Sequence, residues 1–508
     1  MAKKISLKKA RKNTRKHSNG VEKRNNGSEE DSTDSRFGYK AVFFSSFAAI
    51  LGFLLQRGIW QNEMLLPDNN GGWGKAAMKD EQLFNTSQCD IERRFAEDLT
   101  KDDFEKNYRF RKPVLLKFKD GAAGWTDPWK WTKDNLVKEY GKWTVLSGTS
   151  DNIVRSGGNG DQKSSFTEYL NEIMNNEKLK KEPWYMFDRN FYESSDLPDT
   201  IRPPSYLRIT DDDSSIFFLG GSGSGVSFHK HADAWNGVVY GRKRWFLYPV
   251  EFTPPGGVWP SFSQREWFNK VYPTLRPKQM PQECVQEAGE IMYLPESYYH
   301  GTINIGDTVA IGIQKIEATT RIEAMSYQAS GQLGDLVREA KSPDDPLFDQ
   351  VEKKYKKIVS MLPASSEALH KLATLYFHRG NFKDAIKAME KAVALDPWFV
   401  IARVDLAKFY VKLRRPEIAE SILKEALKIH PDSADGNWHY ASLINAKGEY
   451  HKAAKLYRKL ISMNPNKSFV YFQLASILEN IGDVDGAKEV RQQGQDLDER
   501  RRKMKNTK

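Results

Sequence analysis

Between about residues 91 and 324, short apolar runs alternate with turn-forming residues. Each run holds hydrophobic or aromatic positions bounded by turn residues, which is typical of β-strands. The clearest runs lie at 113–117, 215–219, 244–248, 290–294 and 308–312. Because no regular helical pattern separates them, this part of the chain predicts a β-sandwich or barrel.

From about residue 366 the pattern becomes helical and repeats every 34 residues. A small residue recurs in the second helix of each unit, at Ala385, Ala419, Ala453 and Ala487. A proline closes the units at Pro397, Pro431 and Pro465. The turn between the helices holds Gly380, Arg414, Gly448 and Gly482. Small residues let two helices approach closely, and proline ends each unit, so the segment predicts stacked helix pairs.

This spacing and these residue types resemble tetratricopeptide repeats. The resemblance implies an all-α solenoid of four repeats at 366–499, with a capping helix at 345–365 and a basic tail at 500–508. Stacked repeats form a concave surface that holds a peptide or a partner helix. We therefore expect a protein partner on this surface; the alternative is an array that only packs on the preceding domain or dimerises.

The formal net charge of +11 comes mostly from the first 24 residues. Because the rest of the chain is close to neutral, this charge does not indicate a nucleic-acid-binding fold. Residues 1–38 predict a basic disordered tail in the cytosol, and a nuclear-localisation or RNA-binding arm is the alternative.

An uncharged apolar run lies between Lys40 and Arg57, with Tyr39 and Trp60 where interfacial anchors would lie. A membrane span needs about 20 apolar residues, and snorkelling of the flanking cations extends this short run. Basic residues before the run predict a cytosolic N-terminus. We expect a single-pass type II signal anchor at 39–60 in the endoplasmic reticulum membrane. The alternatives are a cleaved signal or a buried helix.

A stalk at 61–89 would then place the later domains in the lumen. Asn85 and Asn466 begin glycosylation acceptor motifs and would be accessible there. The chain has two cysteines, Cys89 and Cys284. They could pair in an oxidising lumen or remain as free buried thiols.

Four polar residues stand out in the β-rich segment: His229, His231, Asp233 and His300. Residues two apart on a strand point to the same face, so the first three can project into one cavity, and His300 can close the site from a distant strand. Two imidazoles and one carboxylate on one side of a metal form the facial triad of non-heme Fe(II) oxygenases. The pattern predicts a metal site with open coordination positions.

Two further motifs resemble the Jumonji-C branch of the cupin-like 2-oxoglutarate oxygenases. The segment 293–300 ends in a Pro-x-x-Tyr-Tyr-His pattern typical of the distal metal histidine, and 241–244 reads Gly-Arg-Lys-Arg. A luminal member of the family carries the same flanking sequences, 220–226 and 240–249. The resemblance covers roughly 90–325 and implies a jelly-roll (double-stranded β-helix) domain. It also implies Fe(II) and 2-oxoglutarate as cofactors, with Lys243 on the far carboxylate and Asn236 helping to hold it.

The ligand set departs from the family pattern. We favour His231, Asp233 and His300 as the ligands, because they supply a literal His-x-Asp…His set. The usual spacing back from Gly241 instead places His229 at the histidine position and His231 at the acid position, so His229 with His231 or Asp233 is the alternative, and a domain without a metal is a third. Gly312 stands where relatives often carry a hydroxyl that contacts 2-oxoglutarate.

The resemblance implies an Fe(II)- and 2-oxoglutarate-dependent protein hydroxylase whose repeats recruit luminal protein substrates. A non-catalytic scaffold of the same two domains is the main alternative, and a nuclear histone demethylase is a third. The hydroxylated residue is not predictable from the sequence, because substrate choice lies in loops with no transferable code.

Overall fold

The computed structural model describes most of the chain after the N-terminal segment. The described residues are 70–155, 160, 162–179, 181–207, 210, 213–257, 262–315, 320–339, 341–465 and 467–506. The expected tail at 1–38 and anchor at 39–60 lie outside them, as does Asn466. Among the described residues, no helix is both long enough and apolar enough to cross a membrane.

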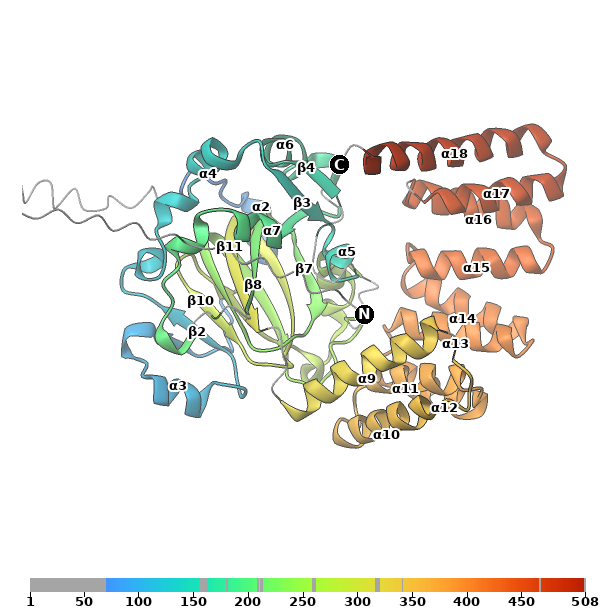
Figure 1. Cartoon of the computed structure of the whole chain (residues 1–508), viewed down its shortest axis with the longest axis horizontal. Helices are drawn as coiled ribbons and strands as arrows, with labels where there is room; N and C mark the ends of the chain where they lie inside the picture. The colour runs from blue at the N-terminus through green and yellow to red at the C-terminus, as the bar shows by residue number, and fades with distance from the viewer. Residues whose placement is uncertain are drawn as a thin grey trace, which may run out of the picture. The chain divides into compact units, whose positions relative to one another are not determined.

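In the described part of the chain, eleven strands form one sheet (Figure 1). Their bounds are β1 Arg93–Phe95, β2 Val114–Lys117, β3 Thr144–Gly148, β4 Gln162–Ser165, β5 Tyr185–Asp188, β6 Asp213–Gly220, β7 Gly225–His229, β8 Ala234–Tyr248, β9 Gln282–Gln286, β10 Ile291–Leu294 and β11 Tyr299–Lys315. The order is β1-β2-β10-β8-β11-β6-β5-β3-β4, with β7 paired to β11 and β9 to β8. The sheet agrees with the expected β-rich, cupin-like domain, and the clearest predicted runs fall on its strands.

The two longest strands, β8 and β11, form an antiparallel pair along most of their length. The register shifts between Ile305 and Val309, opposite Gly241, whose φ is +76°. A Cβ at Gly241 would lie 2.3 Å from the carbonyl oxygen of Asp307, so only glycine fits this bend. The bend divides each strand between two cores: Trp235 packs in one of them and Phe246 in the other.

Short helices cover the sheet and its connections. They are α2 Met78–Phe84, α3 Lys101–Asn107, α4 Lys133–Tyr140, α5 Ser150–Arg155, α6 Phe166–Glu168, α7 Arg189–Ser194 and α8 Gln264–Lys270. The core that contains Trp235 is strongly aromatic: the rings of Trp131 and Phe217 stack at 5.9 Å, and those of Phe166 and Phe191 at 5.5 Å. Rigid aromatic packing fixes the strands that carry the site.

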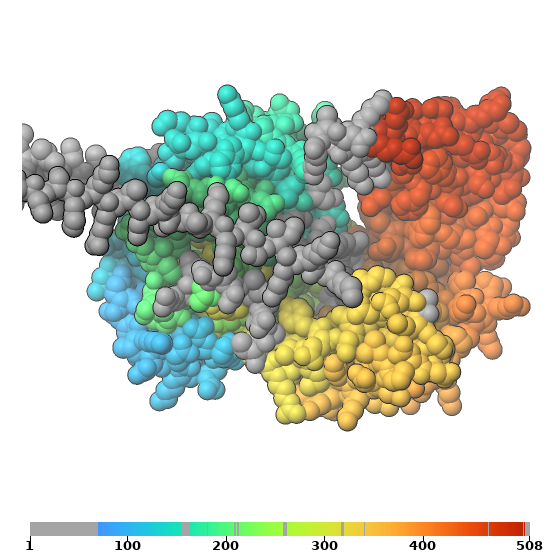
Figure 2. Space-filling view, in the orientation of Figure 1, coloured from blue at the N-terminus to red at the C-terminus, as the bar shows by residue number. Residues whose placement is uncertain are grey.

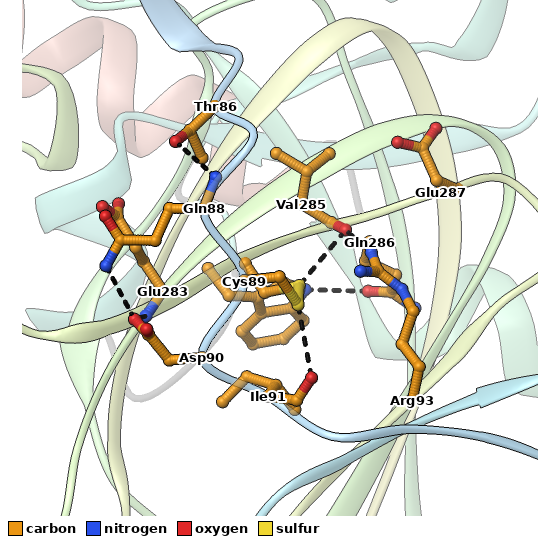
Figure 3. Close-up of a disulfide and its surroundings, with 12 residues drawn as sticks. Thr86, Gln88, Cys89, Asp90, Ile91, Arg93, Glu283, Val285, Gln286 and Glu287 are labelled. Atoms are coloured by element: carbon orange, nitrogen blue, oxygen red, sulfur yellow. Dashed lines mark hydrogen bonds between the residues drawn. A yellow bond between two sulfur atoms is a disulfide. The ribbon is translucent and has the colours of Figure 1, made fainter.

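Cys89 and Cys284 are joined in a disulfide (Figure 3). This settles the choice between a pair and two free thiols that the sequence left open. The bond ties the segment before β1 to β9, and a hydrogen bond from the Glu283 amide to the Asp90 carboxylate lies beside it. Residues 61–89 were expected to form a stalk, yet within them α2 and Trp73 pack on the domain, with Phe84 fully buried.

The C-terminal region is a solenoid of paired helices, which confirms the tetratricopeptide repeats. In Figure 2 they form one continuous body, coloured orange to red. The pairs are α11 Ser366–His378 with α12 Phe382–Leu395, α13 Val400–Lys412 with α14 Pro416–Ile429, α15 Ala434–Ala446 with α16 Tyr450–Met463, and α17 Ser468–Ile481 with α18 Val484–Asn506. The recurring alanines of the second helices are at most 2% exposed, as close helix packing requires.

Arg414 adopts the left-handed conformation that glycine adopts in the other repeats. Its φ is +57°, against +78° to +89° at the equivalent glycines. The 34-residue period therefore continues through the second repeat, although a side chain makes this conformation unfavourable by about 1 kcal/mol.

Two helices precede the four repeats: α9 Arg321–Arg338 and α10 Pro346–Met361. The expected capping helix at 345–365 corresponds to α10. Helix α9 was not anticipated, and the expected domain end at 325 falls inside it. Ala329 and Leu333 of α9 pack in one core with Phe348 and Leu372, so α9 and α10 extend the solenoid toward the cupin-like domain.

Direct contacts join the cupin-like domain to the repeats. The Gly256 amide donates to both carboxylate oxygens of Asp396, at 3.1 and 2.9 Å. The ring of Phe262 lies 6.2 Å from Trp398 and 4.5 Å from His430. These contacts join residues between β8 and α8 to the first repeats.

Removing the disulfide should destabilise the cupin-like domain. The bond closes a loop of 195 residues, and loss of such a bond costs about 2–5 kcal/mol. We expect Cys89→Ser to lower the unfolding midpoint in urea and to make it insensitive to reductant. Wild-type protein in reductant should then match the variant, and equal midpoints for oxidised wild type and variant would contradict the prediction.

The Asp396 junction should make stability depend on pH. Burial raises the pKa of Asp396 to about 7, above the value of about 4 in an unfolded chain. The folded protein therefore binds an extra proton between about pH 4 and 7, and stability falls as pH rises through this window. Asp396→Asn keeps an acceptor for Gly256 but does not titrate. Urea unfolding from about pH 5 to 7 should show the wild type losing up to about 1.4 kcal/mol per pH unit relative to this variant. Parallel profiles of unfolding free energy against pH for the wild type and Asp396→Asn would refute this prediction.

Candidate metal and co-substrate site

Three histidines meet where β7, β11 and the turn after β7 come together. His229 ends β7 and is the register partner of His300 on β11, while His231 follows β7. Their ring centroids lie 4.2 Å apart for His229–His300, 4.7 Å for His231–His300 and 5.4 Å for His229–His231. One ring nitrogen of each lies within 4.8 Å of those of the other two. The group has the size of a metal-binding site.

Each ring is oriented by a backbone carbonyl. The Nδ1 atoms of His229, His231 and His300 lie 2.9, 2.7 and 3.0 Å from the carbonyl oxygens of Ser227, Ala232 and Tyr298. A neutral imidazole that donates from Nδ1 keeps its lone pair on Nε2. All three rings are thus held in the tautomer that offers Nε2 to a metal, as in many metal sites.

Burial keeps these imidazoles neutral. It lowers the pKa of His229 to about 3, and it also lowers the pKa values of His231 and His300. Repulsion between the rings adds to the effect for His229 and His300. Because metal ligands must be deprotonated, the cluster is ready to bind at neutral pH.

Asp233 lies outside this group. Its carboxylate pairs with the Arg109 guanidinium at 2.5 Å and accepts a hydrogen bond from the Tyr293 hydroxyl. Arg109 also donates to the Tyr206 carbonyl at 2.6 Å, which anchors it in place. This arrangement differs from the expectation that the Asp233 side chain faces the same cavity as His231. Strand β7 ends at His229, so strand alternation determines the position of neither His231 nor Asp233, and the ion pair with Arg109 holds Asp233 outside the group.

A cavity adjoins the histidines and contains Lys243 and Asn236, as the resemblance implied. The Lys243 ammonium lies 3.4 Å from Asn236 Oδ1 and 3.3 Å from the Tyr185 hydroxyl. It also lies 4.7 Å above the Phe218 ring. Tyr185 of β5 packs in a core and also lines this cavity. Nothing in its local sequence marks this role, because only strand pairing brings it near.

The Lys243 side chain is buried without a carboxylate partner among the described residues. It is 2% exposed, and burial lowers its pKa to about 7. A buried cation without a counterion is unfavourable, and an anion in the cavity would relieve this cost. The buried ammonium therefore favours a carboxylate in this cavity, beside the three histidines.

Gly312 has no room for a larger residue. A Cβ there would lie 2.6 Å from the Phe218 ring. This is the same ring over which the Lys243 ammonium lies. Phe218 thus occupies the space where the family resemblance led us to look for a hydroxyl.

Asn85 is exposed on the surface, and its side-chain amide donates to Glu81 at 2.7 Å. It is accessible as a glycosylation acceptor, which stays a prediction.

Comparisons with known proteins agree with this architecture. The family model described as a cupin-like domain matches residues 101–312, and tetratricopeptide-repeat models match 346–397, 376–441 and 456–489. JmjC domain-containing protein 8 of Rattus norvegicus is 34% identical over 280 residues, which is 52% of this chain and 97% of the relative.

Two further proteins are similar over parts of the chain. The 2-oxoglutarate and iron-dependent oxygenase JMJD4 of Gallus gallus is 25% identical over 292 residues, covering 50% of this chain and 66% of the relative. Among solved structures, the crystal structure of MamA is 27% identical over 31% of this chain and 91% of its own, with a TM-score of 0.29.

Metal titration should show that the three histidines are metal ligands and that Asp233 is not. We expect replacement of His229, His231 or His300 by alanine to weaken Co(II) binding by more than about 100-fold, beyond the usual effect of losing an outer-shell partner. Asp233→Asn should weaken it less than about tenfold. The visible spectrum of bound Co(II) gives the affinities. Loss of Co(II) binding in Asp233→Asn, with a wild-type unfolding midpoint, would instead make Asp233 a ligand.

Proposed function

Because the chain belongs to the JmjC domain-containing protein family, we propose that it is an Fe(II)- and 2-oxoglutarate-dependent protein hydroxylase whose repeats hold its protein substrate. The cupin-like JmjC domain is the fold of 2-oxoglutarate- and iron-dependent oxygenases. The observation that carries the proposal is the pairing of a neutral three-histidine cluster with a buried lysine that has no carboxylate partner within the part of the chain that the structure describes.

The three Nε2 atoms would hold iron from one side and leave open positions on the other. Three neutral imidazoles leave the full ionic charge uncompensated, so the site favours anionic ligands more strongly than one with a protein carboxylate. With dioxygen as the oxidant, bound iron and 2-oxoglutarate would supply the chemistry that hydroxylates a carbon–hydrogen bond of the substrate.

Lys243 would bind the far carboxylate of 2-oxoglutarate. Contact with that carboxylate raises the pKa of the ammonium again, so binding and protonation support each other. Asn236 and Tyr185 hold the ammonium from two sides. Phe187, Ile216 and Val226 line the same cavity and exclude water.

The repeats would recruit the protein partner, which their family assignment supports. We further propose that the chain is a single-pass protein of the endoplasmic reticulum membrane, with these domains in the lumen. The disulfide between Cys89 and Cys284 supports an oxidising compartment, since such bonds are rare in the cytosol.

A non-catalytic scaffold is the second candidate. It is favoured by the ion pair that holds the Asp233 carboxylate away from the histidines, because a 2-oxoglutarate oxygenase normally uses an acid ligand. The two candidates differ in whether iron and 2-oxoglutarate bind together.

An anaerobic titration of the full chain with Fe(II) and 2-oxoglutarate tests the enzyme. The chelate should give a visible charge-transfer band that disappears in His300→Ala. Lys243→Met should keep Fe(II) binding but raise the 2-oxoglutarate concentration needed by about 10–100-fold, because one charge-assisted hydrogen bond is worth about 1.5–3 kcal/mol. Lys119→Met, at an exposed lysine, is the matched control. Absence of the band in folded wild type would leave the scaffold.

A further inference from the structure

A second cleft reaches the histidine cluster from the side of the repeats. It has a volume of about 250 Å³ and is lined by strands of the cupin-like domain and by helices α9, α10 and α11. His229 lines both this cleft and the cavity that contains Lys243. The two spaces therefore meet at one metal-binding residue, which leaves the Lys243 cavity for the co-substrate and the cleft for another molecule.

The charges within the cleft are already paired. Lys230, between the two histidines of the metal motif, lies 3.3 Å from Glu323 of α9 and 3.8 Å from Glu367 of α11. Glu323 also accepts from the Ser297 hydroxyl at 2.8 Å, and Glu367 from the Tyr299 hydroxyl at 2.6 Å. A second lysine, Lys371 of α11, also lines the cleft. The lining therefore holds two acids and two bases.

The rest of the lining is mainly aromatic and apolar. Tyr327 of α9 is 48% exposed, so one of its faces is open to a ligand. Tyr355 of α10 lies deeper, with its hydroxyl 3.3 Å from Ser330. Aromatic walls with a few polar groups suit a peptide segment. Glu323 and Glu367 already pair with Lys230 and with hydroxyl groups. A cationic side chain entering the cleft would therefore lose its hydration and find no unpaired carboxylate to compensate its charge.

We propose that this cleft admits the substrate polypeptide and presents one uncharged side chain to the histidine cluster. The inference rests on the proposed hydroxylase function and narrows its substrate class. It makes α9, α10 and α11 a wall of the active site, in addition to any binding on the concave surface of the repeats. It also disfavours methylated lysine and arginine side chains, the kind of substrate named for some relatives.

The cysteine content of the chain allows a clean test. Both native cysteines are in the disulfide, so an introduced cysteine is the single free thiol. Ser326 of α9 lines the cleft, whereas Gln328, two residues along the same helix, is exposed and lies outside it. Reaction of Ser326→Cys with N-phenylmaleimide should block the cleft, and the same reaction on Gln328→Cys is the matched control.

The probes are fluorescein-labelled decapeptide pools with randomised flanks and a fixed central Asn, Lys, Arg or Asp. Binding to the metal-free full-length chain is followed by fluorescence anisotropy. We expect the Asn pool to bind at least tenfold tighter than the charged pools. The label at position 326 should weaken this binding at least tenfold relative to the unreacted Ser326→Cys variant, while the label at 328 leaves the binding by Gln328→Cys unchanged.

Equal or tighter binding of a charged pool, no effect of the label at 326, or no binding by any pool would each overturn the proposal. This test and the test of the hydroxylase function can fail independently. A chelate band without peptide binding would reject the peptide-binding role of the cleft and leave the oxygenase proposal intact. Peptide binding without the chelate band would reject the oxygenase proposal and leave the cleft as a peptide-binding site.

Discussion

The antiparallel pairing of β8 with β11 is the constraint on which the rest of the structure depends. It sets Lys243 and Asn236 of β8 against β11. Strand β11 also pairs with β7, and this second pairing places His300 beside the end of β7. Both strands continue from one core into the other, so each core stabilises the same pair of backbones. Because the register is fixed over such a length, the histidines and the lysine cannot shift relative to each other by one residue without exposing a whole strand face.

The sequence carried most of the fold because its periodicities are strong. Short apolar runs bounded by turn residues marked the strands, and the repeat alanines marked the helix pairs. Helix α9 was missed because its polar and small residues, from Arg321 to Arg338, follow no repeat, and its apolar face becomes meaningful only beside α10. The left-handed Arg414 shows the converse: the period of the array overrode a local preference.

The candidate site was predicted less completely than the fold. His229, His231, His300 and Lys243 were identified from spacing and resemblance, and the structure brings all four to one place. Asp233 was grouped with them because alternation was assumed to continue past the end of β7. What decides its position is Arg109, which is 124 residues away in the chain and belongs to no motif. Long-range pairings of this kind leave no local signal, and the same holds for Tyr185 beside Lys243.

The disulfide has a consequence for how the protein is made. Cys284 follows Cys89 by 195 residues, so at synthesis rates of about 5–20 residues per second it emerges roughly 10–40 s later. Through that interval the first cysteine has no partner in its own chain, and most strands of the sheet appear before the bond can form. The disulfide can therefore form only late in the synthesis of the chain. It secures the segment before β1 only after β9 exists to receive it.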